Sequence, residues 1–89
     1  MIFTKEDIAY LKECGNDEED IEQIERATNH TKFELDGVKI SQDKAIGLLG
    51  RKKFISGMMR CAFHASAVRE TNYGGKVYFD CYKWLFGDK

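Results

Sequence analysis

Phe33-Glu34-Leu35-Asp36-Gly37-Val38-Lys39-Ile40 predicts a β-hairpin, and this stretch decides the fold class. Asp-Gly is the typical centre of a two-residue type I′ turn, because both turn positions need positive φ angles. Such a turn places Leu35 opposite Val38 on the neighbouring strand. The same register puts all four apolar side chains of the stretch on one face of the hairpin. An antiparallel sheet with one apolar face is therefore expected in the middle of the chain.

Two helices are predicted before this hairpin. The first begins with the capping-box pair Thr4 and Asp7 and ends at Gly15, which can adopt the left-handed conformation of a helix stop. The second begins at a cap formed by residue 16 or 17 and runs to about Ala27. Its first turn is acidic, as the positive end of the helix dipole favours.

Two more helices and a second hairpin are predicted after the first hairpin. A Ser41 cap starts a helix over residues 42–49, and a longer helix follows over residues 51–64. Residues 67–80 have the pattern of two strands joined by a glycine-containing turn. The aromatic tail, residues 81–89, is expected to pack on the core as a short helix or strand.

The expected architecture is a small α+β fold in the order helix-helix-hairpin-helix-helix-hairpin. Eighty-nine residues with 43% apolar and 33% charged side chains suit one folded domain, residues 1–89. The domain divides into an acidic helical part (1–30), the first hairpin (31–40), a basic helix-turn-helix-like part with the second hairpin (41–80) and the aromatic tail (81–89).

The sequence predicts a cytoplasmic protein without membrane contact. Its longest uncharged stretch, residues 61–68, is far shorter than the roughly 20 residues that a transmembrane helix needs. The first residues lack the basic and apolar regions of a signal peptide. Three cysteines, an odd number, favour a reducing compartment over a disulfide scaffold.

Charge is distributed unevenly along the chain. Residues 1–37 contain eleven acids and four bases, a net charge of −7, whereas residues 38–89 contain ten bases and four acids, a net charge of +6. Such a chain can present one face to a basic partner and another to an acidic partner. The plain alternative is that the two halves neutralise each other across the fold.

The acidic candidates for partner binding lie at the start of the second helix. They are Asp17, Glu18, Glu19 and Glu22. A helix this acidic can mimic a phosphate backbone to a nucleic-acid-binding protein. The alternative is a solvated helix whose acids stabilise the positive end of its dipole.

The basic candidates follow the order helix, tight turn, helix and two-stranded ribbon, which is the order of a winged helix-turn-helix. On the helix over 51–64, a stripe of Lys53, Gly57, Arg60 and His64 is predicted to be exposed. Gly57 would let this helix approach DNA closely. The candidates for nucleic-acid or partner binding are Arg51, Lys52, Lys53, Arg60, His64, Arg69, Tyr73, Lys76 and Tyr78. The alternative is a basic helix whose exposed face is only solvated.

The opposite side of that helix is predicted to be buried. Its apolar members are Phe54, Ile55, Met58, Met59, Ala62 and Phe63.

The aromatic residues near the C-terminus divide into two groups. Tyr73 and Tyr78 are expected to be exposed, where they could stack on single-stranded nucleic acid. A small domain also needs large side chains in its core, and this role is expected for Val77, Phe79, Trp84 and Phe86.

Metal binding and catalysis are not expected. Cys61 and His64 are three residues apart on a helix, and Cys81 could join them, but no CxxC pair is present. Ser66 lacks the surroundings of a nucleophile elbow, and the chain has no glycine-rich phosphate loop. We therefore predict a protein that is not an enzyme and holds neither a metal nor a cofactor.

Several segments resemble small open reading frames of prophages and conjugative elements in Firmicutes. They are Lys44-Ala45-Ile46-Gly47-Leu48-Leu49-Gly50-Arg51, then Phe54 and Arg60, Ala62-Phe63-His64 and Ala67-Val68-Arg69-Glu70. The resemblance implies a compact accessory protein that regulates its element or blunts a host defence, the class that includes anti-CRISPR proteins. It assigns no role to any single residue.

We therefore expect a non-catalytic binding protein of a phage or mobile element that acts on nucleic-acid machinery, in particular as an inhibitor of a host defence nuclease. The expected partner is a protein or nucleoprotein complex. One alternative is a winged-helix-like regulator that binds DNA, and RNA binding is also open. A second alternative is a protein–protein interaction module without nucleic acid. The sequence does not specify the oligomeric state.

Overall fold

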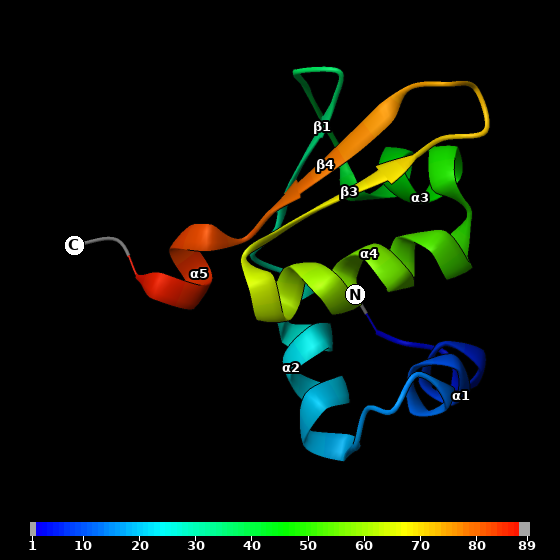
Figure 1. The fold of residues 1–89 in the computed structure, drawn as a ribbon, viewed down its shortest axis with the longest axis vertical. Coiled ribbons are helices and arrows are strands. Elements are labelled where there is room, and N and C mark those ends of the chain that lie inside the picture. The colour runs from blue at the N-terminus through cyan, green and yellow to red at the C-terminus, as the bar shows by residue number, and fades with distance from the viewer. Residues whose placement is uncertain (1, 88–89) are drawn as a thin grey trace.

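The hairpin predicted around Asp36-Gly37 is present and forms half of a four-stranded sheet (Figure 1). The structure, a computed structural model, describes residues 2–87. Its elements in chain order are α1 (Lys5–Glu13), α2 (Glu18–Thr28), β1 (Lys32–Leu35), β2 (Val38–Ile40), α3 (Gln42–Leu49), α4 (Arg51–His64), β3 (Ser66–Glu70), β4 (Lys76–Asp80) and α5 (Tyr82–Phe86). The α+β fold class and the predicted order of elements are confirmed.

The turn of the first hairpin has the predicted geometry. Asp36 and Gly37 have φ angles of 49° and 88°, and Leu35 pairs with Val38. The observed register puts the four apolar side chains on one face as predicted, although Val38 is 66% exposed. The reason is its position: β2 is a three-residue edge strand, so Val38 lies beyond the helices that cover the sheet.

The two hairpins combine into one antiparallel sheet with the strand order β2-β1-β4-β3. The two hairpins are connected by the pairing of β1 with β4, which places Phe33 opposite Phe79. On one face of the sheet, Phe33, Val77 and Phe79 are buried beneath the helices. On the other face, Val68 and Tyr78 form a cross-strand pair and are exposed, so this side of the sheet is not covered.

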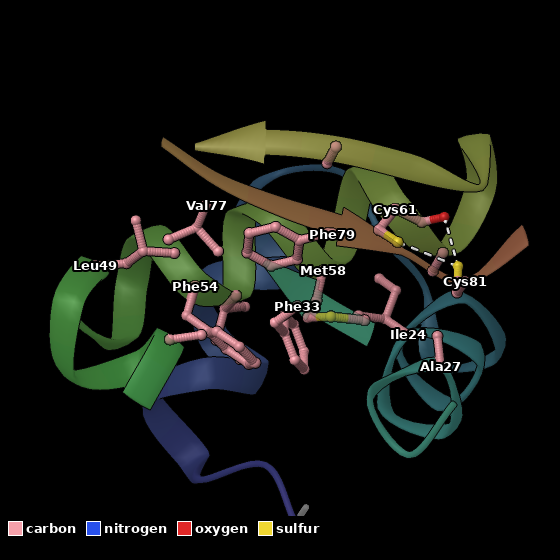
Figure 2. Close-up of a cluster of buried hydrophobic side chains, with 14 of the residues drawn as sticks. Ile24, Ala27, Phe33, Leu49, Phe54, Met58, Cys61, Val77, Phe79 and Cys81 are labelled. Atoms are coloured by element: carbon pink, nitrogen blue, oxygen red, sulfur yellow. Dashed lines mark hydrogen bonds between the residues drawn. The ribbon is translucent and has the colours of Figure 1, made fainter. Parts of the chain in front are cut away.

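Three phenylalanines form the centre of the core (Figure 2). The ring centroids of Phe33, Phe54 and Phe79 lie 5.3 to 5.7 Å apart, and Phe33 meets Phe79 edge to face at 79°. A methyl group added at Gly57 would lie 2.5 Å from Cζ of Phe79. The prediction that Gly57 is exposed for close approach to DNA is therefore wrong. Gly57 is buried because the Phe79 ring fills the space beside it.

Helix α4 is the central helix of the fold. It packs against the sheet and against α1, α2 and α3, with α1 and α2 on the side away from the sheet (Figure 1). Phe54, Ile55, Met58 and Ala62 are buried as predicted. Phe63 is not, and it is 41% exposed because it lies at the border of the buried arc in the last turn of the helix.

Local sequence signals set the helix ends. Thr4 and Asp7 form the predicted capping box at α1, and Asp17 caps α2 through a second capping box with Asp20. The Ser41 hydroxyl caps α3. These side chains satisfy backbone N–H groups that a helix start leaves without partners.

The aromatic tail forms the short helix α5. Trp84 and Leu85 are partly buried against the core, and the Trp84 ring stacks on His30 with a centroid distance of 5.4 Å. The core role expected for Val77 and Phe79 is confirmed. For Phe86 it is wrong, because this ring is 61% exposed and packs on Tyr82 at the surface of α5. The last two residues of the predicted tail lie outside the described part of the chain.

Among the described residues, no helix combines the length and apolar character required to cross a membrane.

Candidate partner-binding surfaces

Arg51, the first residue of α4, is held in an ion pair with Asp7 of α1. Its Nε donates to both carboxylate oxygens of Asp7, at 3.1 and 3.0 Å, and its Nη2 lies 2.9 Å from Oδ2. Burial alone would raise the pKa of Asp7, but hydrogen bonds from Arg51 and from the backbone N–H of Thr4 outweigh burial and lower it. The ion pair holds α4 against α1, so the Arg51 guanidinium already has a partner within the fold.

The next two cations of α4 also have partners within the protein. The Nζ of Lys52 lies 5.1 Å from the ring centroid of Tyr10, which is a cation–π contact. The Nζ of Lys53 donates a hydrogen bond to the backbone carbonyl of Glu70 at 2.8 Å. Both lysines thus connect α4 to neighbouring elements.

Arg69 lies on β3, an edge strand of the sheet. Its Nη1 donates to the carbonyl of Val68 at 2.9 Å, and its Nη2 donates to the hydroxyl of Ser56 on α4 at 3.1 Å. With the Lys53–Glu70 contact, two carbonyl groups of β3 are bound by cationic side chains. Lysine and arginine used in this way hinder the addition of a foreign strand to a free sheet edge.

The remaining basic and aromatic candidates do not form one surface. Arg60 and His64 are exposed on α4 and make no side-chain hydrogen bond or ion pair within residues 2–87. Lys76 and Tyr78 are exposed on the uncovered face of the sheet. Tyr73 is exposed in the turn between β3 and β4, so its predicted exposure and that of Tyr78 are confirmed. The nine candidates are therefore spread over separate parts of the fold.

The acidic candidates do lie together, on the exposed side of α2. We call Glu18, Glu19 and Glu22 the α2 ridge. Glu22 forms an ion pair with Arg26 one turn further along the same helix. Glu18 and Glu19 are exposed, and neither side chain has a hydrogen-bond or ion-pair partner in the described chain. Asp17 is exposed beside the ridge and caps the helix.

A cleft of about 360 Å³ separates the α2 ridge from α5. It is lined by Glu19, Glu22, Gln23, Arg26, Trp84 and Leu85. The cleft brings carboxylates and an indole ring to one place, although α2 and α5 are far apart in the sequence. The sequence predicts a core role for Trp84. No local pattern links it to α2, because the two meet only through the fold.

A larger cleft, of about 610 Å³, lies between α1 and the start of α4. Its walls include Asp7, Tyr10, Arg51 and Lys52. Asp7 with Arg51 and Tyr10 with Lys52 form the ion pair and the cation–π contact described above, and Glu6 and Glu13 add two further carboxylates to this cleft.

The thiol and imidazole groups do not assemble a metal site in the described part of the chain, where no three His, Cys, Asp or Glu side chains gather suitably. Cys61 is buried, whereas His64, in the last turn of α4, is exposed. Cys81 is buried next to Cys61, and Cys14 is exposed.

No family model, curated protein or solved structure matches this chain. The class that its geometry defines is a small α+β domain, with helices on one face of an antiparallel sheet and a charged α2 ridge on the far helical side.

Proposed function

We propose that this chain is a non-catalytic binding protein that presents the α2 ridge to a basic surface of a nucleic-acid-binding partner. The observation that carries the proposal is the difference between its two sets of charges. Arg51, Lys52, Lys53 and Arg69 are engaged inside the fold, whereas Glu18 and Glu19 face solvent within the described chain. A charge that already has an internal partner has less to gain from an external one.

The cleft beside the ridge gives the contact a defined centre. A lysine or arginine side chain of the partner enters between Glu19 and Trp84, where it meets a carboxylate and the edge or face of an indole ring. Trp84 is restrained by stacking on His30, with the two rings 6° from parallel. A restrained aromatic side chain loses little conformational entropy on binding, which favours it as an interface anchor.

The test uses a fluorescently labelled arginine-rich peptide, and labelled single-stranded and duplex DNA, at two salt concentrations. We expect the peptide to bind and DNA to bind weakly. Reversing the ridge charges in one variant, Glu18→Lys with Glu19→Lys and Glu22→Lys, should weaken peptide binding by tenfold or more, about 1.4 kcal/mol.

A matched control reverses Glu6, Glu13 and Asp43 to lysine, which changes the net charge equally on α1 and α3. Glu6 and Asp43 stand in first turns, as Glu18 and Glu19 do, so the effect on helix dipoles is also matched. Thermal unfolding of both variants checks that they fold. Equal loss of peptide binding in the control and in the ridge variant contradicts a localised site.

In the version that the resemblance to mobile-element accessory proteins implies, the protein acts in the cytoplasm and its partner is the nucleic-acid channel of a defence nuclease. Occupying this channel would keep the nuclease from its substrate. A competition assay tests this version of the proposal. The protein should displace DNA from an RNA-guided nuclease, and the variant with reversed ridge charges should not. If the protein binds the peptide but does not displace DNA, the α2 ridge remains the proposed binding surface and this nuclease is rejected as the target.

A DNA-binding regulator is the second candidate. The order α3, α4, β3 and β4 supports it, as does the exposure of Arg60 and His64 on α4. Duplex binding that falls steeply with salt and is lost in Arg60→Ala would favour this function over the first. Duplex affinity that is unchanged in Arg60→Ala rejects it.

A further inference from the structure

Two buried cysteines meet at the junction of α4, β4 and α5. Cys61 lies in the last turns of α4, and Cys81 follows β4 directly (Figure 2). Their sulfur atoms are 3.1 Å apart, and the thiol of Cys81 also donates to the backbone carbonyl of Cys61 at 3.1 Å. Both side chains are almost completely buried, whereas the third cysteine, Cys14, is exposed.

We propose that Cys61 and Cys81 are a site of reversible disulfide formation. A disulfide bond is about 2.05 Å long, so the sulfurs need to approach by about 1 Å. The sequence separation of 20 residues excludes a trivial contact between neighbours and requires the native fold to bring the two thiols together. This inference does not depend on the proposed function.

The oxidant that balances the reaction is a low-molecular-weight disulfide such as glutathione disulfide. One cysteine thiolate attacks a glutathione sulfur, the glutathione S–S bond breaks, and one glutathione thiolate leaves. The second cysteine thiolate then attacks the cysteine sulfur of the mixed disulfide, which releases the second glutathione. The protein is oxidised by two electrons, glutathione disulfide is reduced by two, and the two thiol protons end on the released glutathione thiols.

Cys81 is the residue that should react first. Burial raises the pKa of both thiols, which keeps them protonated and slow to react in the closed fold. Cys61 is held in the central helix, whereas Cys81 directly precedes the five-residue helix α5 at the end of the described chain. Undocking α5 exposes Cys81 at much lower cost than opening α4. The rate of oxidation is therefore set by the undocking of α5.

The disulfide would close a loop that contains β3, its turn and β4. This cross-link fastens the end of the sheet to α4 and restricts the unfolded chain. For a domain of this size, we expect oxidation to raise the midpoint of thermal unfolding by on the order of 10 °C, and dithiothreitol to reverse the rise.

The test treats the folded Cys14→Ser variant with excess glutathione disulfide and labels remaining thiols with N-ethylmaleimide in denaturant. Removal of Cys14, which is exposed, leaves only the proposed pair. We expect a species with no maleimide or glutathione adduct and a mass lower by two hydrogens. Peptide mapping should join Cys61 to Cys81. Two maleimide adducts after prolonged oxidation, or a stable glutathione adduct on Cys81, would overturn the proposal.

The Cys61→Ser variant in the same background serves as the control, and so does treatment of the unfolded protein. In Cys61→Ser, oxidation should stop at the mixed disulfide with glutathione on Cys81. If the unfolded Cys14→Ser protein forms the disulfide as rapidly as the folded protein does under weak oxidation, the native contact has no role and the proposal fails.

Discussion

Replacing Gly57 by alanine tests the packing at the centre of the fold. A Cβ at this position would lie 2.5 Å from Cζ and 2.7 Å from Cε2 of Phe79, about 1 Å closer than two carbon atoms normally approach. The ring cannot move freely, because Phe33 and Phe54 hold it from other sides. Overpacking of this kind costs about 1–3 kcal/mol, against about 1 kcal/mol gained from the better helix propensity of alanine. We expect a net loss of up to about 2 kcal/mol in the free energy of unfolding.

The assay is urea denaturation followed by circular dichroism. Gly47→Ala is the matched control, since Gly47 lies in α3 with open space around its Cα and should gain about 0.5–1 kcal/mol. In a Phe79→Leu background the penalty of Gly57→Ala should shrink, which separates the ring contact from general strain. If Gly57→Ala is as stable as Gly47→Ala, the reasoning is refuted.

Two further predictions concern charge and turn geometry. Asp7 has a lowered pKa in the folded state, so its ion pair with Arg51 stabilises the protein fully above the unfolded-state pKa, about 4, and is lost as the pH falls through the lower folded-state value. Asp7→Asn should therefore lower the free energy of unfolding by roughly 1–3 kcal/mol near pH 7 and by much less near pH 2. Urea denaturation at both pH values checks this. An equal loss at both pH values would contradict the prediction. Gly37→Ala should cost about 1 kcal/mol, because Gly37 has a φ of 88° in the hairpin turn. A Gly37→Ala protein as stable as wild type in the same assay would mean that the turn is not under this constraint.

The features that could be predicted from the sequence are those with short-range causes. Capping boxes join residues three positions apart, and the Asp36-Gly37 turn fixes a register between adjacent strands. The pairing of β1 with β4 has no comparable signal, because their residues are more than 40 positions apart. The prediction for Gly57 was wrong for the same reason, because its surroundings depend on a residue distant in the sequence. Helical periodicity placed Gly57 in the stripe predicted to be exposed, whereas the Phe79 ring of a strand distant in the sequence covers it.

Several basic side chains make contacts inside the fold that no local sequence pattern predicts. In a small domain, lysine and arginine side chains are long enough to reach a neighbouring helix or strand. They can therefore connect elements of the fold as readily as they bind phosphate. Arg51 reaches α1, Lys53 reaches the edge of β3, and Arg69 reaches α4. The plain alternative for the charge asymmetry, neutralisation between the two halves, holds for Arg51, which pairs with Asp7, whereas Lys53 and Arg69 bind uncharged groups. Glu18 and Glu19 of α2 make no hydrogen bond or ion pair in the described chain, so the α2 ridge keeps negative charge that a partner can use.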